Sequence, residues 1–414
     1  MHNRSAVAAV ITCAAMLAAT GCSSSFGSDK KTAQDASSKQ HLTVLIASSG
    51  DAETKAVKDA AAAWAKQSGN TVTVDLAKDI NQQLGQAFAG NKPPDAFYVD
   101  SSQFANYAKG GSLYPYGSQI KDADDFSAQL RTSFTYDGKL VCLPKDTSTL
   151  ALVINTGLWQ KAGLSAKDYP TSWAQLKTVA AKLTKGKVTG LVINGEYARV
   201  GVFMKEAGGW ITNSDQTKMT ADSTQNAQAL GYVQSLLKSG SMKYASQVDT
   251  GWGGEAFGKG KAAMTIEGNW LTGAMKADFP GVKYAVVPLP AGPAGKGTLA
   301  FSQCWGVAQA SAHRAAAVDL VKYLTSATQQ LKNADAFGVM PSRTSALAEY
   351  GKKYPAAKAW ADGTAYAQGP VTVAGFDKVL AQFNTDIAAL GTGDAKKILS
   401  DLQRNGEQAL TKGD

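Results

Sequence analysis

Histidine is scarce in this sequence, with only three in 414 residues. His2 lies at the N-terminus, His41 opens the first predicted strand, and His313 stands alone far along the chain. Protein zinc sites bring together three or four ligands, most often histidine and cysteine. We therefore predict no histidine-based metal site and no cofactor.

The common signatures of catalytic sites are also missing. The sequence has no G-x-S-x-G turn of the kind that presents a nucleophilic serine. GPAGKGT, residues 292–298, lacks the G-x-x-x-x-G-K spacing of a phosphate-binding loop, and an ordinary Gly/Pro loop explains it. Paired carboxylates of a glycosidase stay open as an alternative, because any two acids can converge in a fold.

Clusters of basic residues and long apolar runs are absent as well. The formal charge is +9, but lysine and arginine are scattered, with no run of five or more. We therefore predict no nucleic acid partner and interpret the surplus as a solvated surface, with weak attraction to an anionic cell surface as the alternative. Neither the apolar run near the N-terminus nor any later one reaches the roughly 20 residues that span a bilayer.

The N-terminus has the pattern of an export signal. MHNRSAVAAVITCAAMLAATGC carries Arg4, then an apolar run from Ala6 to Thr20, then small residues before Cys22. Residues 23–40, SSSFGSDKKTAQDASSKQ, are polar and low in complexity, which is typical of a flexible tether.

Residues 19–22, Ala-Thr-Gly-Cys, resemble the bacterial lipoprotein box, although that motif prefers leucine where Ala19 stands. The resemblance implies a lipoprotein signal peptide over residues 1–21 and a lipidated tether over 22–40, with the lipid on Cys22. An ordinary signal peptide that happens to contain cysteine is the alternative. After cleavage and lipidation only Cys142 and Cys304 remain. Two cysteines in an exported chain favour a disulfide over a metal site, with two buried thiols as the alternative.

The first part of the domain alternates strand and helix patterns. Strands are predicted over 41–48, 71–77 and 93–100, and helices over 52–69, 80–90 and 101–111, the last with Ser101 or Ser102 as N-cap. This order predicts a mostly parallel sheet covered by helices. Ligands of such sheets bind beyond the carboxyl ends of the strands. That position is occupied by Ser48, Ser49, Asp51, Asp100 and Ser101.

From residue 137 the chain reads DGKLVCLPKDTSTLALVINTGLWQKAGLSAKDYPTSWAQLKTVAAKLT. GEYARVGVFMKEAGGW (195–210), AMTIEGNW (263–270), YAVVPLPAGPAGKGT (284–298) and ADAFGVMPSR (334–343) follow in order. These stretches resemble the extracellular solute-binding proteins of bacterial sugar ABC importers, the family that includes maltose-binding protein. The resemblance covers nearly all of residues 41–414.

The resemblance implies an α/β, two-lobed periplasmic-binding-protein type II fold, with a hinge of crossover strands and a C-terminal helical region. Lobe one is expected over residues 41–144 and 306–350. Lobe two is expected over 145–305, with C-terminal helices over 351–414.

The implied function is capture of a sugar, expected to be an oligosaccharide, and its delivery to the permease subunits of an ABC importer. The protein is expected to be a monomer, held by its lipid at the outer face of the cytoplasmic membrane, and not an enzyme. One alternative is that the same scaffold binds another solute, such as a polyol. The other is that the protein is a secreted carbohydrate-active hydrolase.

A sugar site needs aromatic faces and short polar groups. Of the eight tryptophans, Trp64, Trp159, Trp173 and Trp360 lie in helical patterns and are interpreted as core. Trp210, Trp252, Trp270 and Trp305 adjoin glycines in predicted loops or strand ends. Trp270 matches the position of a sugar-stacking tryptophan of the family, and Tyr197, behind Glu196, matches a stacking tyrosine. A core tryptophan that caps a strand is the alternative for Trp270.

Polar candidates come from strand ends, with Asp51, Asp100, Asp146 and Glu267 as acceptors and Arg199 and Arg343 as donors. For each of them a solvated or capping role stays open. Asp146 is favoured because the resemblance places the turn 144–146 at the crossover. The complete candidate set is Ser49, Asp51, Asp100, Ser101, Asp146, Glu196, Tyr197, Trp210, Trp252, Glu267, Trp270, Trp305 and Arg343.

The resemblance also places the two remaining cysteines. Cys142 lies in the strand that leaves lobe one, and Cys304 lies in the strand that returns to it. The fold of the family runs these crossover strands side by side, so the two residues are expected opposite each other and joined by a disulfide.

Overall fold

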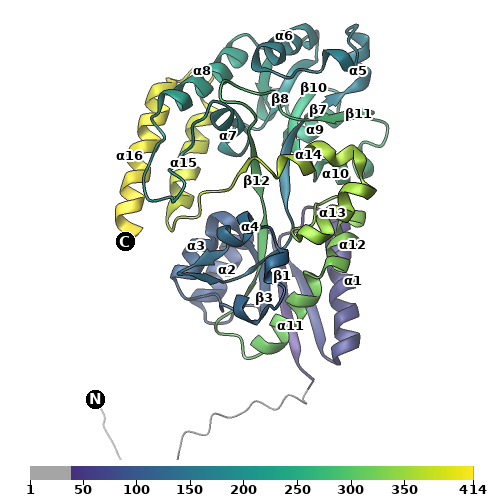
Figure 1. Ribbon diagram of the computed structural model, residues 1–414, viewed down its shortest axis with the longest axis vertical. Helices are drawn as coiled ribbons and strands as arrows, with labels where there is room; N and C mark the ends of the chain where they lie inside the picture. Colours follow the sequence, from purple (N-terminus) through teal and green to yellow (C-terminus); the bar gives the residue numbers. More distant parts are fainter. Residues whose placement is uncertain (1–38, 414) are drawn as a thin grey trace, which may run out of the picture. The chain divides into compact units, whose positions relative to one another are not determined.

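The structure is a computed structural model that describes residues 39–413 (Figure 1). The predicted signal peptide, the lipid attachment at Cys22 and nearly all of the tether lie outside these residues. Within them, no helix combines the length and the apolarity needed to cross a membrane.

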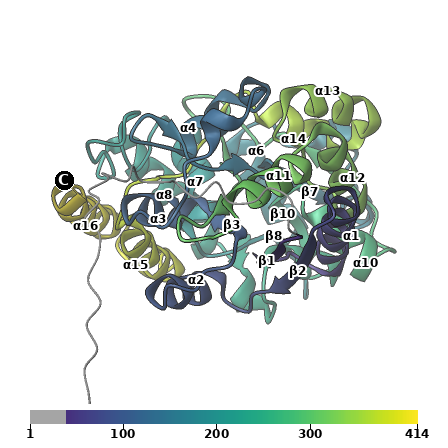
Figure 2. The same cartoon turned by 90° about the horizontal axis from the view of Figure 1, so that it is seen from below.

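The first sheet is built from the strands that the sequence predicts. β1 (His41–Ile46) pairs in parallel with β2 (Thr71–Leu76) and β3 (Ala96–Asp100). The intervening helices are α1 (Asp51–Ser68), α2 (Ile80–Ala89) and α3 (Ser101–Lys109). Figure 2 shows α1 beside β1 and β2.

The predicted N-cap of α3 is wrong. Neither Ser101 nor Ser102 caps this helix, because the chain passes directly from β3 into it, and Asp100 holds the N-cap position. The Asp100 side chain caps no backbone N–H and accepts a hydrogen bond from the Gln303 amide at 2.6 Å.

Two strands from the middle of the chain complete this sheet. β13 (Gln303–Val307) pairs antiparallel with β3, and β6 (Leu143–Pro144) pairs antiparallel with β13. The order is β2-β1-β3-β13-β6. We call this sheet and its helices lobe one, whose core also includes α11 (Arg314–Leu324).

Lobe two is built on the larger sheet, with the order β14-β12-β7-β10-β8-β9 and with β11 paired to β7. Its strands are β7 (Ser148–Asn155), β8 (Thr189–Ile193), β9 (Met242–Tyr244), β10 (Ala262–Gly268), β11 (Tyr284–Val287), β12 (Thr298–Phe301) and β14 (Ala367–Gln368).

The helices packed on this sheet include α5 (Thr156–Lys161), α6 (Trp173–Leu183), α7 (Tyr197–Glu206), α8 (Thr224–Lys238), α9 (Gly253–Gly258), α10 (Leu271–Asp278), α14 (Lys358–Gly363), α15 (Phe376–Ala388) and α16 (Ala395–Gly413). The structure also contains α4 (Ala128–Ser133), β4 (Thr135–Tyr136), β5 (Lys139–Leu140), α12 (Ala327–Phe337) and α13 (Thr344–Lys353).

The two faces of the lobe-two sheet carry separate cores. Successive side chains of a strand point to opposite faces. Leu150 and Leu152 of β7 therefore join the core formed with α7, α8, α15 and α16, whereas Ala151 and Val153 join the core formed with α9, α10 and α14. In Figure 1, α7, α15 and α16 lie to the left of β7 and β12, and α10, α13 and α14 to the right.

The lobes are joined by strands that run side by side. β7 continues β6 after residues 145–147, and β13 continues β12 after Ser302. Phe301 lies opposite Ser148, and Trp305 opposite Leu143, so three residues on one strand face four on the other. This extra residue makes a bulge, which bends a strand pair, at the point where the chain changes lobes.

The structure moves the predicted lobe boundaries. The boundary expected between residues 305 and 306 falls inside β13, which lies wholly in the lobe-one sheet. Helix α13, expected in lobe one, places Ala346 and Tyr350 in buried positions, and Tyr350 belongs to a lobe-two core. Residue patterns alone do not tell which of two cores an amphipathic helix joins.

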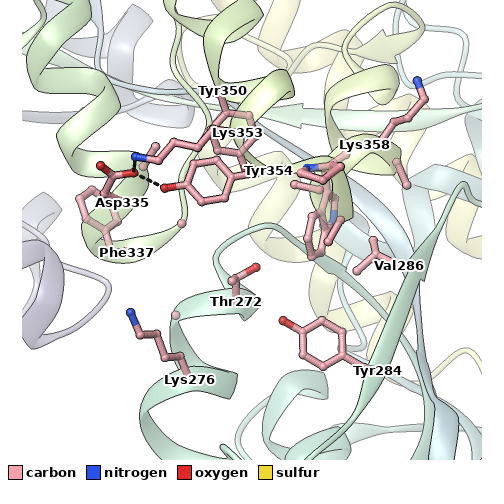
Figure 3. A pocket seen from close by; sticks show the side chains of 18 of the residues that line it. Thr272, Lys276, Tyr284, Val286, Asp335, Phe337, Tyr350, Lys353, Tyr354 and Lys358 are labelled. Carbon is pink, nitrogen blue, oxygen red and sulfur yellow. Dashed lines mark hydrogen bonds and ion pairs between the residues drawn. The ribbon is translucent and has the colours of Figure 1, made fainter.

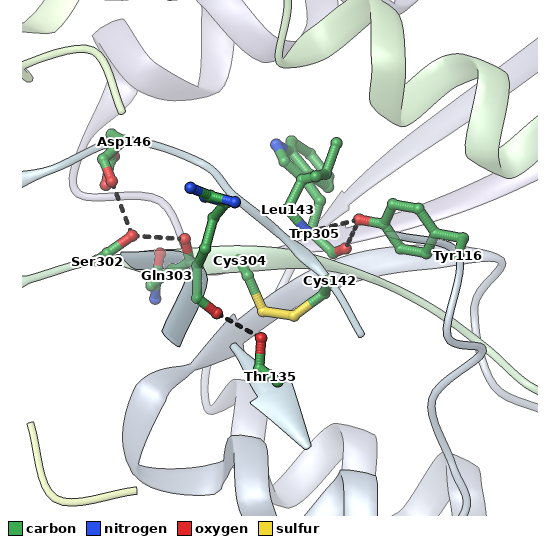
Figure 4. Close-up of a disulfide and its surroundings, with 10 residues drawn as sticks. Tyr116, Thr135, Cys142, Leu143, Asp146, Ser302, Gln303, Cys304 and Trp305 are labelled. Carbon is green, nitrogen blue, oxygen red and sulfur yellow. Dashed lines mark hydrogen bonds between the residues drawn. A yellow bond between two sulfur atoms is a disulfide. The ribbon is translucent and has the colours of Figure 1, made fainter. Parts of the chain in front are cut away.

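Cys142 and Cys304 form a disulfide with a Cα–Cα distance of 5.7 Å (Figure 4). Both side chains are fully buried in the core of lobe one. Cys304 lies opposite Pro144, so Cys142 is its diagonal neighbour and not directly opposite, as the resemblance implied. The disulfide therefore joins the two crossover strands on the lobe-one side of the bulge.

Candidate functional site

A charged and aromatic cluster lies where α7, β10 and α10 meet in lobe two. Glu267, fully buried in β10, accepts a hydrogen bond from the Arg199 guanidinium at 2.7 Å and one from the Trp270 indole N–H at 3.1 Å. The guanidinium carbon of Arg199 lies 5.3 Å from the centre of the Trp270 ring, within the range of a cation–π contact. Trp270 is thus oriented by two buried charged groups.

The indole of Trp270 is only partly buried, at the edge of the lobe-two core. Phe301 of β12 packs against it edge to face, with 5.5 Å between the ring centres. The indole also lies across the backbone of Gly268, where a Cβ atom would stand 2.2 Å from the ring. These contacts fix the orientation of the indole, and its role as a stacking platform stays a prediction.

Burial raises the pKa of Glu267, while the Arg199 guanidinium and the Trp270 N–H act in the opposite direction. Arg199 also lies 3.4 Å from the partly exposed carboxylate of Glu196. One guanidinium therefore contacts two carboxylates and one aromatic ring, which fixes the geometry of all three.

Tyr197 follows Glu196 and is the first residue of α7. Its backbone N–H donates to the Asn384 side chain of α15 at 2.8 Å, and its ring packs partly buried against the same core as Trp270. Burial, and then the charge of Glu196, raise the pKa of Tyr197 to about 12, so its hydroxyl stays neutral at physiological pH. Asn384 was missed by sequence reasoning, because only the tertiary fold brings α15 to α7.

A second polar cluster lies in lobe one, beside the crossover. The Lys145 ammonium lies 2.8 Å from the Glu53 carboxylate and 2.5 Å from that of Asp146. The Tyr98 hydroxyl donates to Glu53 at 3.0 Å. All four side chains are buried, and only Asp146 among them could be predicted as a candidate from the sequence.

The pKa values of the two carboxyl groups in this cluster are shifted in opposite directions. Burial raises the pKa of Asp146, and the Lys145 ammonium opposes this. Burial also acts to raise the pKa of Glu53, but Lys145 and Ser49 stabilise its carboxylate enough to lower it. Ser49 contributes through its N–H and its hydroxyl, at 2.8 and 2.6 Å from Glu53.

The crossover segment 301–303 connects the two clusters. Phe301 packs on Trp270 in lobe two, and Gln303 donates to Asp100 in lobe one. Between them, the Ser302 hydroxyl donates to the backbone carbonyl of Asp146 at 2.7 Å (Figure 4). Three consecutive residues at the hinge therefore contact the candidates Trp270, Asp146 and Asp100.

Residues 59–401 match the family model of the bacterial extracellular solute-binding proteins. The chain belongs to this family. The diacetylchitobiose binding protein DasA of Streptomyces coelicolor is 27% identical to this solute-binding protein over 360 residues, covering 82% of each chain.

Solved structures support the same fold. An ABC substrate-binding protein of Listeria monocytogenes, solved in complex with cycloalternan, superimposes with a TM-score of 0.82 at 24% identity, covering 90% of this chain and 100% of its own. The GacH receptor of Streptomyces glaucescens, solved unliganded and with acarbose, gives a TM-score of 0.80 at 24% identity, covering 90% of this chain and 99% of its own. These matches confirm the predicted two-lobed α/β fold.

Three of the candidates in this solute-binding protein are buried and hold structural contacts, and their role as ligand contacts stays a prediction. Trp305 is 2% exposed and packs edge to face on Tyr98 in the lobe-one core. Trp210 is 8% exposed in the lobe-two core. Arg343 is 5% exposed, donates to Asp122, Asp125 and the Thr325 carbonyl, and covers the Phe126 ring. These contacts stabilise the lobe cores, and they hold the Nε and Nη1 groups of Arg343.

The other candidates keep accessible positions or polar contacts near the hinge. Asp51 is exposed at the start of α1, Ser101 is partly exposed at the start of α3, and Trp252 is a partly exposed residue before α9. The structure gives none of these three a contact with Trp270. The four tryptophans interpreted as core, Trp64, Trp159, Trp173 and Trp360, are all buried.

Proposed function

We propose that this solute-binding protein captures an oligosaccharide outside the cell and delivers it to the permease subunits of an ABC importer. The observation that carries the proposal is the partly exposed Trp270, which Glu267, Arg199 and Phe301 hold in place. Trp270 lies in the AMTIEGNW stretch that resembles the family. A sugar ring has a flat patch of C–H groups. Covering about 100 Å² of it with an indole contributes about 2.5 kcal/mol.

The polar groups of both lobes complete the proposed site. Asp100, Asp146 and Ser49 of the lobe-one side and Glu196 and Tyr197 of lobe two offer acceptors and donors for sugar hydroxyls. A ligand that touches both lobes favours the closed arrangement by the free energy of those extra contacts. Stacking supplies affinity in this account, and hydrogen bonds supply selectivity.

The names of the relatives support a sugar as the ligand class. DasA is named for diacetylchitobiose, and the solved neighbours hold cycloalternan and acarbose. These names fit a site that combines more than one aromatic side chain with polar groups.

We propose that the protein performs no bond chemistry. A glycosidase needs two carboxyl groups that flank the scissile bond and remain free to act as acid, base or nucleophile. The buried carboxylates near the hinge are instead engaged, Glu267 with Arg199 and Asp146 with Lys145. Such pairing suits side chains that orient a site, and it leaves no free acid–base pair among them.

We propose that a lipid on Cys22 anchors a monomer at the outer face of the cytoplasmic membrane. The apolar segment before Cys22 and the polar residues 23–40 after it support this placement.

Isothermal titration calorimetry against a panel of solutes tests the function. The panel contains diacetylchitobiose, maltotriose, cycloalternan, a monosaccharide and the polyol sorbitol. We expect one oligosaccharide to bind at a 1:1 ratio with a micromolar or tighter dissociation constant, and to be recovered unchanged after long incubation. If only sorbitol binds, the ligand is a polyol and not an oligosaccharide. If shorter sugars are released, the protein is a hydrolase.

A further inference from the structure

A cavity of about 710 Å³ lies in lobe two between α10, β11, α12, α13 and α14 (Figure 3). Aromatic rings form much of its wall, and they come from Tyr284, Phe337, Tyr350, Tyr354 and Trp360. Its volume falls within the 300–1,000 Å³ that is usual for small-molecule sites.

This cavity is separate from the proposed sugar site. Tyr350 and Trp360 belong to the core on the Ala151 and Val153 face of the sheet. Trp270 and Tyr197 pack on the core of the opposite face. The two places share one helix, because α10 begins directly after Trp270 and contributes Thr272 and Lys276 to the cavity wall.

The charges around the cavity are mostly positive. Its lining includes three lysines, at 276, 353 and 358, and one acidic residue, Asp335. Asp335 is already bound by the Lys353 ammonium at 2.5 Å and by the Tyr354 hydroxyl, and Lys358 is paired with Asp362 at 2.7 Å. No ion pair of Lys276 is found among residues 39–413, which leaves its exposed ammonium available.

We propose that this cavity is a second ligand site, for a small anion with a flat apolar body such as an aromatic carboxylate. The rings can cover the apolar body, and offset or edge-to-face contacts between aromatic rings add to the gain from burial. The Lys276 ammonium supplies the countercharge at the wall. Charge complementarity therefore selects an anion over a neutral or cationic molecule of the same shape.

The lining disfavours a second sugar. Hydroxyl groups of a saccharide need several partners, and an unpaired polar group in an apolar site weakens binding. The Tyr354 hydroxyl is committed to Asp335, and much of the remaining wall consists of alanine, valine and aromatic side chains. The cavity thus differs in chemistry from the cluster around Glu267 and Arg199.

The test uses 8-anilinonaphthalene-1-sulfonate, an aromatic anion whose fluorescence rises in apolar sites, with the whole folded protein. We expect saturable binding to one site, and at least tenfold weaker binding of the neutral analogue N-phenyl-1-naphthylamine. Lys276→Gln should weaken binding of the sulfonate about tenfold. Lys332→Gln, which removes an exposed lysine of α12 outside the cavity, should change nothing.

Two further variants locate the site. Ala336→Trp adds bulk at an exposed position of the wall and should abolish binding while leaving circular dichroism and melting temperature unchanged. Trp270→Ala should leave sulfonate binding intact, so the result does not depend on the proposed sugar site. Equal binding of the neutral analogue, or unchanged binding in Lys276→Gln or in Ala336→Trp, would overturn the proposal.

Discussion

Replacement of Trp270 by alanine is the perturbation that separates a stacking platform from a structural tryptophan. The substitution removes an indole that is partly buried and contacts Glu267, Arg199 and Phe301. If a sugar ring covers about 100 Å² of this surface at about 25 cal/mol per Å², the loss approaches 2.5 kcal/mol. We expect a cost of about 2 kcal/mol or more, which is about thirtyfold in affinity.

The fold should survive this change. Glu267 keeps its 2.7 Å hydrogen bond to Arg199 when the indole is gone, so no buried carboxylate loses its only partner. The lost Trp270 N–H bond to the Glu267 carboxylate is worth about 1.5–3 kcal/mol of stability. Calorimetric titration with the cognate oligosaccharide measures the affinity, and urea unfolding of the same sample measures the stability.

A Trp270→Phe variant is the matched control. Phenylalanine keeps a flat apolar face but cannot donate to Glu267, so it should recover most of the binding, within about tenfold of the wild type. Unchanged affinity of Trp270→Ala for the oligosaccharide would refute the stacking role of the indole. That role is also refuted if binding is lost only together with the urea transition, or if phenylalanine restores nothing.

Four further perturbations test other parts of the account. Scattering should report a smaller radius of gyration at saturating sugar, and an unchanged value would contradict lobe closure. The Cys142→Ser/Cys304→Ser double variant should lose up to about 5 kcal/mol of unfolding free energy, because the disulfide closes a separation of 162 residues, and equal stability in urea would contradict this. Cys22→Ser should release the protein from the membrane or leave it unprocessed, and normal retention would refute the anchor. Burial opposes the shift, but hydrogen bonds from Ser345 and its neighbours lower the pKa of Asp125 to about 2, below the unfolded value, so its stabilisation is present above about pH 4 and is lost as pH falls toward 2. The difference in unfolding free energy between wild type and Asp125→Asn should shrink over that window, and a constant difference would argue against it.

Features set by local spacing could be predicted from the sequence. The helix that begins near residue 51 stops at Gly69, which adopts the left-handed conformation with φ of 76°. Glu267 and Trp270 are three residues apart at the end of one strand, and both were candidates. The family resemblance supplied the two-lobed plan, because ordered stretches of sequence carry information that single motifs do not.

Features set by long-range contacts could not be predicted in this way. The partners of Arg199 and Lys145, namely Glu267 and Glu53, lie 68 and 92 residues away in the sequence. Trp305 was assigned to the ligand because it adjoins a glycine near a strand end. In the structure β13 lies between β3 and β6, and both faces of the strand from Cys304 to Val307 are buried, which only the tertiary fold determines.

The most direct test of the central claim is a crystal structure of the protein with its cognate oligosaccharide. The account predicts a sugar ring stacked on the indole of Trp270 in lobe two, with hydroxyl groups bonded to side chains of lobe one such as Asp100 or Asp146. A ligand bound away from Trp270, or one that contacts a single lobe only, would contradict it.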